Sequence, residues 1–406
     1  MSNHFDIPKS ERKLRVLMIA PQPWFQPRGT PFSVLHRIKA MSLLGHHIDL
    51  ATYHVGEDVA IDNLTIHRAR PIPFVKKVKI GPSLAKIPLD MALYAQALRL
   101  LKKNQYDLLH THEEASFFGV HLANRFGLPH LYDMHSSLPQ QLDNFKYPGA
   151  RVFKKIFERL ERRTISNASA LITICPELQK YVESHFPQQT SILIENVADN
   201  SLVFPPQDSQ EQALRRKYNL NGRKLVLYYG TFETYQGLDL LISSAEKLIE
   251  GSDKKVHFLL VGGNPTQIQH YRQMARSRNI QDHFTFTGFV RPQLIPSFIS
   301  MADVLVSPRI KGTNSPLKIY SYLRSGRPIV ATRHITHTQI LDDSVAMLVA
   351  PDPDALARGI RDVLTNKELG RRLAANAQKL AEAQYSYTDY LKKTEWILQQ
   401  AARVDG

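Results

Sequence analysis

The sequence contains one cysteine and lacks any long apolar run. A single cysteine excludes an internal disulfide and is typical of a reducing compartment. Cys175 follows the apolar run from Ala170 to Ile174, so we expect a buried, inert thiol and not a nucleophile. No stretch approaches the ~20 apolar residues of a membrane span, and the polar N-terminus has no signal-peptide core. We therefore expect a cytoplasmic protein that contacts the inner face of the cell membrane at most peripherally.

Signatures of several ligand classes are also missing. No Gly-x-Gly-x-x-Gly follows the first predicted strand, which argues against a nicotinamide cofactor. Zinc-finger spacings and aromatic–basic RNA motifs are absent, so nucleic acid is not an expected partner. The only Asp-x-Asp, at Asp352 and Asp354, lies at a predicted helix start and is interpreted as a cap. His110 and His112 form a His-x-His pair, but the sequence places no third ligand beside them. We therefore expect neither a metal nor a cofactor.

Basic side chains outnumber acidic ones by 52 to 37, which gives a net charge of +15. The excess is +7 over residues 1–200 and +8 over residues 201–406, so it is spread along the chain and not held in a tail. Such a surplus favours anionic partners, namely phosphates or acidic lipid headgroups.

Two basic segments with interspersed apolar residues suit an acidic membrane surface. One is an amphipathic helix predicted from Arg151 to Ile165. The other is residues 72–86, which contain Lys76, Lys77, Lys79 and Lys86. Each segment also fits an ordinary solvated face, so peripheral membrane contact is one of two interpretations.

A chain of 406 residues is too long for one core and predicts two domains of about 200 residues each. Strand-like and helix-like segments alternate in both halves, which indicates parallel sheets wrapped by helices. We expect two Rossmann-like, doubly wound α/β domains, one over residues 1–198 and one over residues 199–386. Residues 387–406 contain a last helix, which we expect to return to the N-terminal domain.

Ligands of such sheets lie at the carboxyl ends of the strands. The predicted strand over residues 14–20 runs into a proline-rich loop, and we expect the next helix from about Phe32 to Leu44. Predicted strands over residues 107–112 and 130–133 also end in polar residues. Parallel strands bring these ends to one edge, so the residues there are candidates for one site. They are Gly29, Thr30, Glu113, Glu114 and His135.

The second half repeats the alternation, with glycines where strands end. Predicted strands over residues 224–229, 256–261 and 284–286 each lead into such a position. Glycine there lets the backbone approach a ligand closely. The candidates are Gly230, Thr231, Glu233, Gly262, Gly263, Thr287 and Gly288.

The stretch over residues 304–332 has the strongest signature of an anion site. A short apolar strand ends in a polar loop, and Pro316 occupies the favoured first position of a helix that runs to about Ser325. The unpaired N–H groups at the helix start, with a lysine one turn in, favour an anion. An ordinary strand–loop–helix unit with a solvated lysine is the alternative. The candidates are Arg309, Asn314, Ser315, Pro316, Leu317, Lys318 and Ser321.

Two similar α/β domains, the strand-end glycines and the Gly326-x-Pro328 turn together resemble the GT-B glycosyltransferases. More narrowly, the chain is similar to the retaining family-4 group, which uses nucleotide sugars. The resemblance covers most of the chain and implies two domains that face a cleft. Both glutamates of the family's motif are replaced, by Thr313 and Ser321.

The two cations that the family places on the diphosphate are missing as well, since their positions fall near Thr231 and Gln236. Lys318, Arg309 and Lys311 are the cations available to replace them, because the leaving group requires positive charge near the helix N-terminus. In the first half, His135 matches the family's histidine near the transferred sugar.

The resemblance implies transfer of a hexose from a nucleotide-diphosphate sugar to a glycan, lipid or small-molecule acceptor, with retention and without a metal, as in polysaccharide biosynthesis. His135 would hold the sugar, and Glu113 or Glu114 would hold the acceptor or its proton. Two interpretations remain open beside it. One is another GT-B activity, a sugar-nucleotide epimerase or a phosphorylase, and the other is a catalytically inactive nucleotide-binding scaffold.

Overall fold

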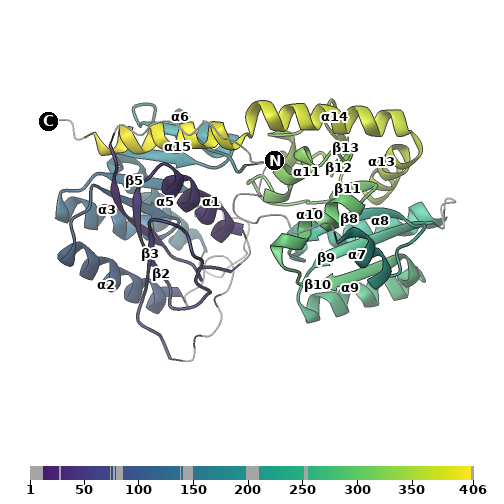
Figure 1. The fold of residues 1–406 in the computed structure, drawn as a ribbon, viewed down its shortest axis with the longest axis horizontal. Helices are drawn as coiled ribbons and strands as arrows, with labels where there is room; N and C mark the ends of the chain where they lie inside the picture. The colour runs from purple at the N-terminus through teal and green to yellow at the C-terminus, as the bar shows by residue number, and fades with distance from the viewer. Residues whose placement is uncertain are drawn as a thin grey trace. The chain divides into compact units, whose positions relative to one another are not determined.

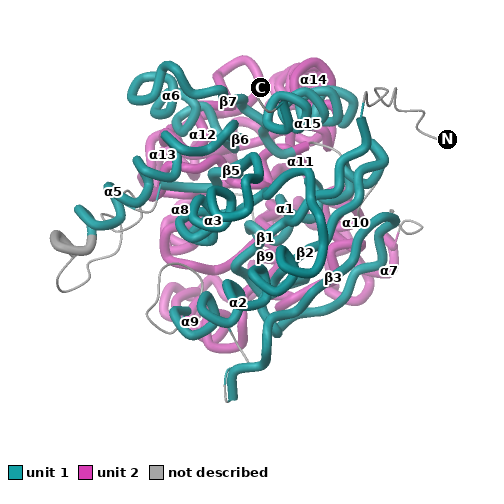
Figure 2. Tube along the Cα trace, turned by 90° about the vertical axis from the view of Figure 1, so that its left-hand side faces the viewer, with its two compact units in different colours: residues 1–196, 387–406 teal, residues 197–386 magenta. Residues whose placement is uncertain are grey.

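The computed structural model describes residues 12–26, 29–73, 75, 78, 86–137, 139, 150–197, 210–250 and 255–403. The chain divides into two compact units (Figure 2). Unit 1 consists of residues 1–196 and 387–406, and unit 2 of residues 197–386. Each unit is built around its own parallel sheet, so the predicted pair of doubly wound α/β domains is confirmed.

The sheet of unit 1 has seven strands in the order β3-β2-β1-β4-β5-β6-β7, and every neighbouring pair is parallel. The order reverses beside β1, which is the switch point where such sheets bind ligands. The strands are β1 (Arg15–Ala20), β2 (His47–Thr52), β3 (Leu64–Arg68), β4 (Leu108–His112), β5 (His130–Met134), β6 (Ala170–Thr173) and β7 (Ser191–Leu193).

The helices of unit 1 include one from the far end of the chain. They are α1 (Gly29–Leu43), α2 (Ile87–Lys103), α3 (Ala115–Phe126), α5 (Ala150–Asn167), α6 (Pro176–His185) and α15 (Tyr387–Ala402). The C-terminal helix α15, yellow in Figure 1, packs against α1 and against β5, β6 and β7. The last helix is therefore part of the first unit's core.

The sheet of unit 2 has six strands in the order β10-β9-β8-β11-β12-β13, again all parallel. The strands are β8 (Lys224–Gly230), β9 (Val256–Gly262), β10 (Phe284–Gly288), β11 (Val304–Ser307), β12 (Ile329–Thr332) and β13 (Met347–Val349). The helices are α7 (Glu211–Lys217), α8 (Leu238–Glu250), α9 (Pro265–Ser277), α10 (Ile295–Met301), α11 (Leu317–Arg324), α12 (Ile335–Thr338), α13 (Pro353–Thr365) and α14 (Lys367–Gln384), with 3₁₀ turns at Thr234–Gln236, Gln281–His283 and Pro292–Leu294.

Strand β8 shows why the strand sequences of unit 2 are continuous apolar runs. Leu225 and Leu227 pack into the core on one face of the sheet, whereas Val226 and Tyr228 pack into the core on the other. Successive side chains of a strand point to opposite faces, and helices cover both faces here. No position between Leu225 and Tyr228 is left for a polar side chain.

Several element boundaries differ from the sequence-based expectation. Helix α1 begins at Gly29, so Gly29 and Thr30 open the helix instead of lying in the loop before Phe32. The expected start was wrong because Pro31 was read as part of the loop, although proline fits the first turn of a helix. The apolar run in residues 191–196 predicts a strand as far as Asn196, but β7 ends at Leu193.

The expectations for Cys175 and Asp352 are confirmed. Cys175 is fully buried, and burial raises the pKa of its thiol to about 11, so the thiol is held protonated. Asp352 caps α13, where its Oδ1 accepts a hydrogen bond from the Ala355 N–H at 2.9 Å. Among the described residues, no helix combines the length and apolar character needed to cross a membrane.

Glycines at the carboxyl edge of unit 2 allow backbone segments to touch. Gly262 ends β9 with φ +123°, and a Cβ there would lie 2.0 Å from the carbonyl oxygen of Gly230. Gly237 has φ +74°, and its Cβ would lie 1.9 Å from the carbonyl oxygen of Pro308. Both contacts are with backbone atoms, so a side chain could be accommodated only by moving the strand ends.

Replacing Gly262 by alanine should therefore cost more stability than an unfavourable φ alone. Gly222→Ala is the matched control, because Gly222 also has positive φ (+70°) but has nothing within 4 Å of its Cβ position. We expect the Gly262→Ala variant to lose about 1–3 kcal/mol more than the control, the usual cost of overpacking. Urea denaturation followed by circular dichroism measures both losses. Equal losses would show that the contact with Gly230 imposes no constraint.

Candidate active site

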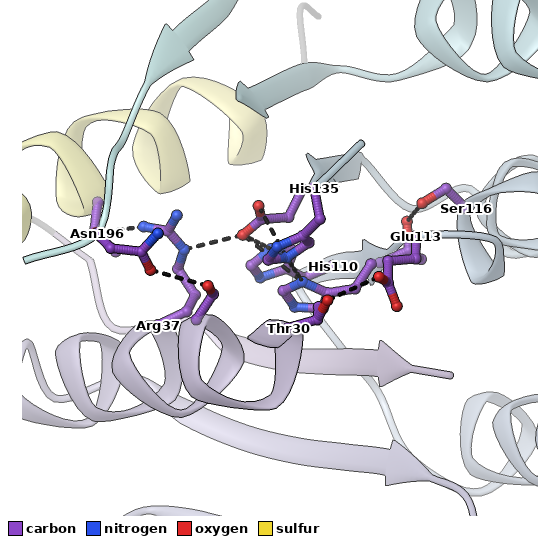
Figure 3. A network of polar contacts seen from close by, with 12 residues as sticks. Thr30, Arg37, His110, Glu113, Ser116, His135 and Asn196 are labelled. Carbon is purple, nitrogen blue, oxygen red and sulfur yellow. Dashed lines mark hydrogen bonds and ion pairs between the residues drawn. The ribbon is translucent and has the colours of Figure 1, made fainter. Parts of the chain in front are cut away.

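Three histidines and an aspartate meet where β4 and β5 end in unit 1. The two strands pair in parallel with His112 opposite Asp133, and His135 follows the end of β5. His112 Nδ1 and His135 Nε2 lie 2.9 Å apart and share a hydrogen bond. His110, two residues before His112, places its Nε2 3.6 Å from Asp133 Oδ2 (Figure 3). All four side chains are buried, so this polar cluster lies within the protein.

Arg37 of α1 carries the positive charge of this cluster. Its Nε donates to Asp133 Oδ2 at 3.1 Å, and its Nη1 donates to Thr394 Oγ1 of α15 at 2.9 Å (Figure 3). Burial, the largest single cause, would raise the pKa of Asp133, but the charge of Arg37 and the contacts with the three histidines together outweigh it and hold that pKa well below its usual range. Asp133 is therefore a permanent carboxylate.

Burial lowers the pKa of both His110 and His112 below 6.5, that of His112 strongly. Each ring therefore has one N–H and one lone pair near neutral pH. The Nε2 of His112 and both ring nitrogens of His110 have no hydrogen-bond partner in the described part of the chain. Since buried polar atoms are normally paired, these positions indicate a functional cluster more than a stabilising one.

The same cluster provides the third ligand that the His-x-His pair lacked in the sequence. Ligand atoms of His110, His112 and Asp133 all lie within 4.8 Å of one another, a spacing that could hold a metal ion. The guanidinium of Arg37 already occupies Asp133 Oδ2, however. A divalent cation bound there would face a buried positive charge, so the arrangement suits an ion pair better than a metal.

Two glutamates follow β4 at the same edge. Glu113 has φ +49°, which is unusual for a residue with a side chain, and its Oε1 accepts a hydrogen bond from Thr30 Oγ1 of α1 at 2.9 Å. Burial, and then the charge of Glu114, raise the pKa of Glu113. The predicted residues Thr30, Glu113, Glu114 and His135 are thus gathered in one region, with Gly29 at the start of α1 beside Thr30.

Lys86 is not available to a membrane, contrary to one expectation from the sequence. Its Nζ lies 2.8 Å from Glu114 Oε1, and only 13% of its side chain is exposed. Burial is the largest single cause and would lower the pKa of Lys86, but the nearby carboxylates, Glu114 first among them, together outweigh it and raise that pKa overall. The interpretation failed because the partner carboxylate is distant in sequence. Lys76, Lys77 and Lys79 lie outside the described residues.

In unit 2, Lys318 is the buried cation of the carboxyl edge. It lies in the first turn of α11 and is only 6% exposed. Its Nζ lies 3.7 Å from the centre of the Tyr228 ring and donates to Gln236 Oε1 at 3.3 Å. A Cβ on Gly230 would lie 3.1 Å from this Nζ, so the glycine leaves room for the amine. The alternative interpretation, in which Lys318 is solvated, is therefore wrong.

The amine of Lys318 contacts a π face and an amide oxygen. Burial, and then the charge of Arg309, lower the pKa of Lys318 well below 10.5. Gln236 and Thr231 mark the positions where the resembled family would place cations on a diphosphate. Lys318 thus brings an amine from α11 to the region where those cations are missing.

The remaining candidates of the 304–332 stretch form the surroundings of Lys318. Arg309 lies over the Tyr235 ring, 5.1 Å from its centre, and its Nε donates to the Lys311 carbonyl at 2.9 Å. Ser321 hydrogen-bonds the hydroxyl of Tyr229. Ser315 is buried, and its Oγ has no partner within the described ranges. The other three are the half-buried Asn314 and Leu317 and the buried Pro316, which precedes α11.

Five strand-end candidates of unit 2 lie outside the contacts described for Lys318. Thr287 and Gly288 line a pocket of about 860 Å³ together with residues of α9. Glu233 accepts a hydrogen bond from Gln267 Nε2 of α9 at 3.1 Å. Gly262 touches the Gly230 backbone, and a Cβ on Gly263 would lie 2.4 Å from the Phe232 ring.

Sequence reasoning missed Arg37, Asp133, Gln236 and Tyr228 as site residues. Two of them left a detectable signal. Arg37 follows Ser33 by four residues and so shares the buried face of α1, where a charge needs a partner. Asp133 lies two residues before His135, a spacing that places both on one face of an extended segment.

In unit 1, ionisation of Asp90 in the first turn of α2 opposes folding. Burial raises its pKa to about 7 from 3.8, and Tyr53 donates a hydrogen bond to its Oδ1. Because the folded state binds the proton more tightly, wild-type stability falls as the pH rises from about 4 through 7. The Asp90→Asn variant does not ionise and keeps an acceptor for Tyr53. Its stability relative to wild type, from urea denaturation, should therefore increase between pH 5 and pH 8. A constant difference would show that Asp90 is ordinarily solvated.

Family models match both units of the chain. The model described as Glycosyltransferase Family 4 matches residues 27–200, and the model described as Glycosyl transferases group 1 matches residues 210–380. The chain is 23% identical over 382 residues to a phosphatidyl-myo-inositol mannosyltransferase of Mycobacterium leprae, with 92% of this chain and 94% of the relative covered.

Solved structures share the fold over nearly the whole chain. The sucrose-phosphate synthase of Thermosynechococcus elongatus has a TM-score of 0.78 at 19% identity, with 95% of this chain and 98% of the other covered. Anabaena Alr3699/HepE, solved in complex with UDP-glucose, has a TM-score of 0.71 at 15% identity and covers 95% and 99%. With both units matched by family models and the fold shared throughout, the chain belongs to the family-4-type glycosyltransferases of the GT-B fold.

Proposed function

We propose that this glycosyltransferase moves a hexose from a nucleotide-diphosphate sugar to a glycan, lipid-linked or small-molecule acceptor, with retention and without a metal. The observation that carries the proposal is the buried amine of Lys318, which lies beside Gly230 and Gln236 with a neutral hydrogen-bond partner. No carboxylate of the described residues forms an ion pair with this amine, so its charge is available to an anionic ligand.

Departure of a nucleoside diphosphate requires positive charge that strengthens its contacts as the glycosidic bond stretches. The first turn of α11 offers backbone N–H groups together with Lys318, and Arg309 lies near enough to depress the pKa of that lysine. Binding a diphosphate would relieve the repulsion between these two cations. This supports binding of the diphosphate without a metal, even though the family's usual cations and glutamates are absent.

The acceptor side is proposed for unit 1. His135 would contact the transferred sugar, and Glu113 would accept a hydrogen bond from the attacking hydroxyl. The unusual φ of Glu113 and its hydrogen bond from Thr30 fix the direction of that carboxylate. With retention, the acceptor attacks on the face that the diphosphate leaves, and the leaving phosphate takes the proton.

The donor is proposed to be a UDP-sugar, since a neighbour of the same fold was solved with UDP-glucose. Incubating the protein with UDP-hexoses and a panel of glycan and lipid acceptors tests this directly, and NMR of the product gives its anomeric configuration. Interconversion of the nucleotide sugar without an acceptor would favour the epimerase, and release of a sugar phosphate would favour the phosphorylase. Donor binding without turnover would favour the inactive scaffold.

Removing the charge of Lys318 should abolish most turnover. Lys318→Met keeps an unbranched side chain of similar length in the buried site and loses only the amine, so the fold should survive. Loss of one preorganised contact to the leaving group typically costs ~10²–10³ in kcat. Lys318→Arg should restore only part, because Gly230 and Tyr228 leave no room for a planar guanidinium.

Ser321→Ala is the matched control on the same helix. Its hydroxyl makes one neutral hydrogen bond, to Tyr229, so its loss should weaken donor binding by no more than about 1 kcal/mol. Steady-state kinetics with a saturating acceptor separate the two variants. Full turnover in Lys318→Met together with loss of activity in Ser321→Ala would exclude the proposed diphosphate grip.

Peripheral membrane contact is proposed for α5, in support of a lipid-linked acceptor. Its exposed side chains include Lys155, Arg159, Arg162 and Arg163, and Ile156 is 51% exposed among them. Basic residues around an exposed apolar side chain suit the surface of an acidic bilayer.

Each cation near an acidic surface contributes about 1 kcal/mol, so reversing two of them should weaken binding strongly. We expect Arg159→Glu/Arg163→Glu to reduce sedimentation with phosphatidylserine vesicles at low salt. Arg371→Glu/Arg372→Glu makes the same charge change on exposed residues of α14 and should bind like wild type. Equal binding of wild type to acidic and neutral vesicles would end the proposal.

A further inference from the structure

Two buried groups, His112 and Asp133, converge on one nitrogen of His135. Its Nε2 lies 2.9 Å from His112 Nδ1 and 3.4 Å from Asp133 Oδ1. Arg37 holds the other oxygen of the same carboxylate at 3.1 Å. The exposed fractions of His112, Asp133 and His135 are 0%, 1% and 4%, so water does not compete for these contacts.

We propose that His112 and Asp133 are positioning residues that fix the ring of His135 and hold it in the tautomer protonated on Nε2. The proposal rests on the proposed function, in which His135 contacts the transferred sugar. In this tautomer, Nε2–H donates to His112 Nδ1, and Nδ1 of His135 is the nitrogen that accepts a hydrogen bond from a sugar hydroxyl.

The position of the carboxylate decides between the two tautomers. The shared proton can reside on His135 Nε2 or on His112 Nδ1, which are 3.4 Å and 3.8 Å from the nearest oxygen of Asp133. A buried carboxylate attracts the nearer N–H and repels the nearer lone pair. Protonation on His135 Nε2 is therefore favoured.

Arg37 maintains the preference for the tautomer of His135 that is protonated on Nε2. Its ion pair ensures that Asp133 remains charged, and its second hydrogen bond, to Thr394 of α15, fixes the guanidinium in place. His110 is the fourth group facing the carboxylate, at 3.6 Å, but no contact joins it to His135 among the described residues. The two histidines of β4 are therefore predicted to differ in role, although they are equally buried.

The first test reads the tautomer without any turnover. Long-range ¹H–¹⁵N spectra of histidine-labelled protein distinguish a protonated nitrogen from a lone pair, and His135→Gln identifies the signals of His135. We expect Nε2 to be protonated in the wild type. His112→Leu should shift the nitrogen signals of His135 toward a mixture of tautomers, and His112→Asn should preserve them, because its amide oxygen lies near the position of Nδ1.

The second test is kinetic, and His110→Leu serves as the matched control for the His135 signals. We expect His112→Leu to lower kcat by about 10–100-fold, as misplacement of a positioned group does, with a smaller change in the KM for the donor. His112→Asn should recover activity to within a few-fold of the wild type. His110→Leu removes an equally buried imidazole and should leave the His135 signals in place.

A wild-type His135 protonated on Nδ1, or equal effects of His110→Leu and His112→Leu on its signals, would overturn the inference. Neither result depends on sugar transfer. If the wild type shows the expected tautomer and transfers no sugar from any donor, the proposed function fails while the assignment of positioning residues stands.

Discussion

The ion pair between Arg37 and Asp133 is the interaction on which the first unit depends. Both groups are almost completely buried, at 3% and 1% exposure, so each would be very costly alone. The pair joins α1 to β5, and the second hydrogen bond of Arg37 joins α1 to α15, which comes from the far end of the chain. Such a pair contributes little net stability relative to an apolar core, but it fixes one arrangement of three elements.

A second buried polar contact also joins α15 to the rest of unit 1. His46 Nε2 lies 2.8 Å from Glu395 Oε2, one residue after the threonine that Arg37 contacts. Three residues beyond the end of β7, Asn196 accepts a hydrogen bond from Ser33 of α1 at 2.9 Å. Helix α1 is therefore tied to both segments of unit 1 that lead directly into unit 2. The ion pair organises the carboxyl edge of the sheet of unit 1, and hydrogen bonds of α1 connect that edge to Asn196 and to α15.

The buried charge of unit 2, on Lys318, has different surroundings from that of Arg37. Lys318 contacts the Tyr228 ring and the amide of Gln236, while Arg309 adds repulsion and not attraction. Folding energy from elsewhere, chiefly the apolar cores on both faces of this sheet, must offset the cost of burying that amine. The paired charge of Arg37 organises structure, whereas the buried amine of Lys318 is the group that we propose binds a ligand of opposite charge.

The sequence by itself determined the elements and the sheet edges at which the candidate site residues lie. Apolar runs gave β8 and β11 to within a residue, and Pro316 marked the start of α11, because both signals are local. Parallel connection then placed Glu113, His135 and Lys318 at carboxyl ends, since strands in such sheets point the same way.

Only the tertiary structure decided what those residues contact. Lys86 and Lys318 are both lysines near a helix start, yet one pairs with Glu114 and the other lies on Tyr228. Their partners are 28 and 90 residues away in the sequence, and no periodic pattern encodes which strand lies beside which. The ionisation of a buried group depends on those distant neighbours, so its chemical role is decided only when the sheet has assembled.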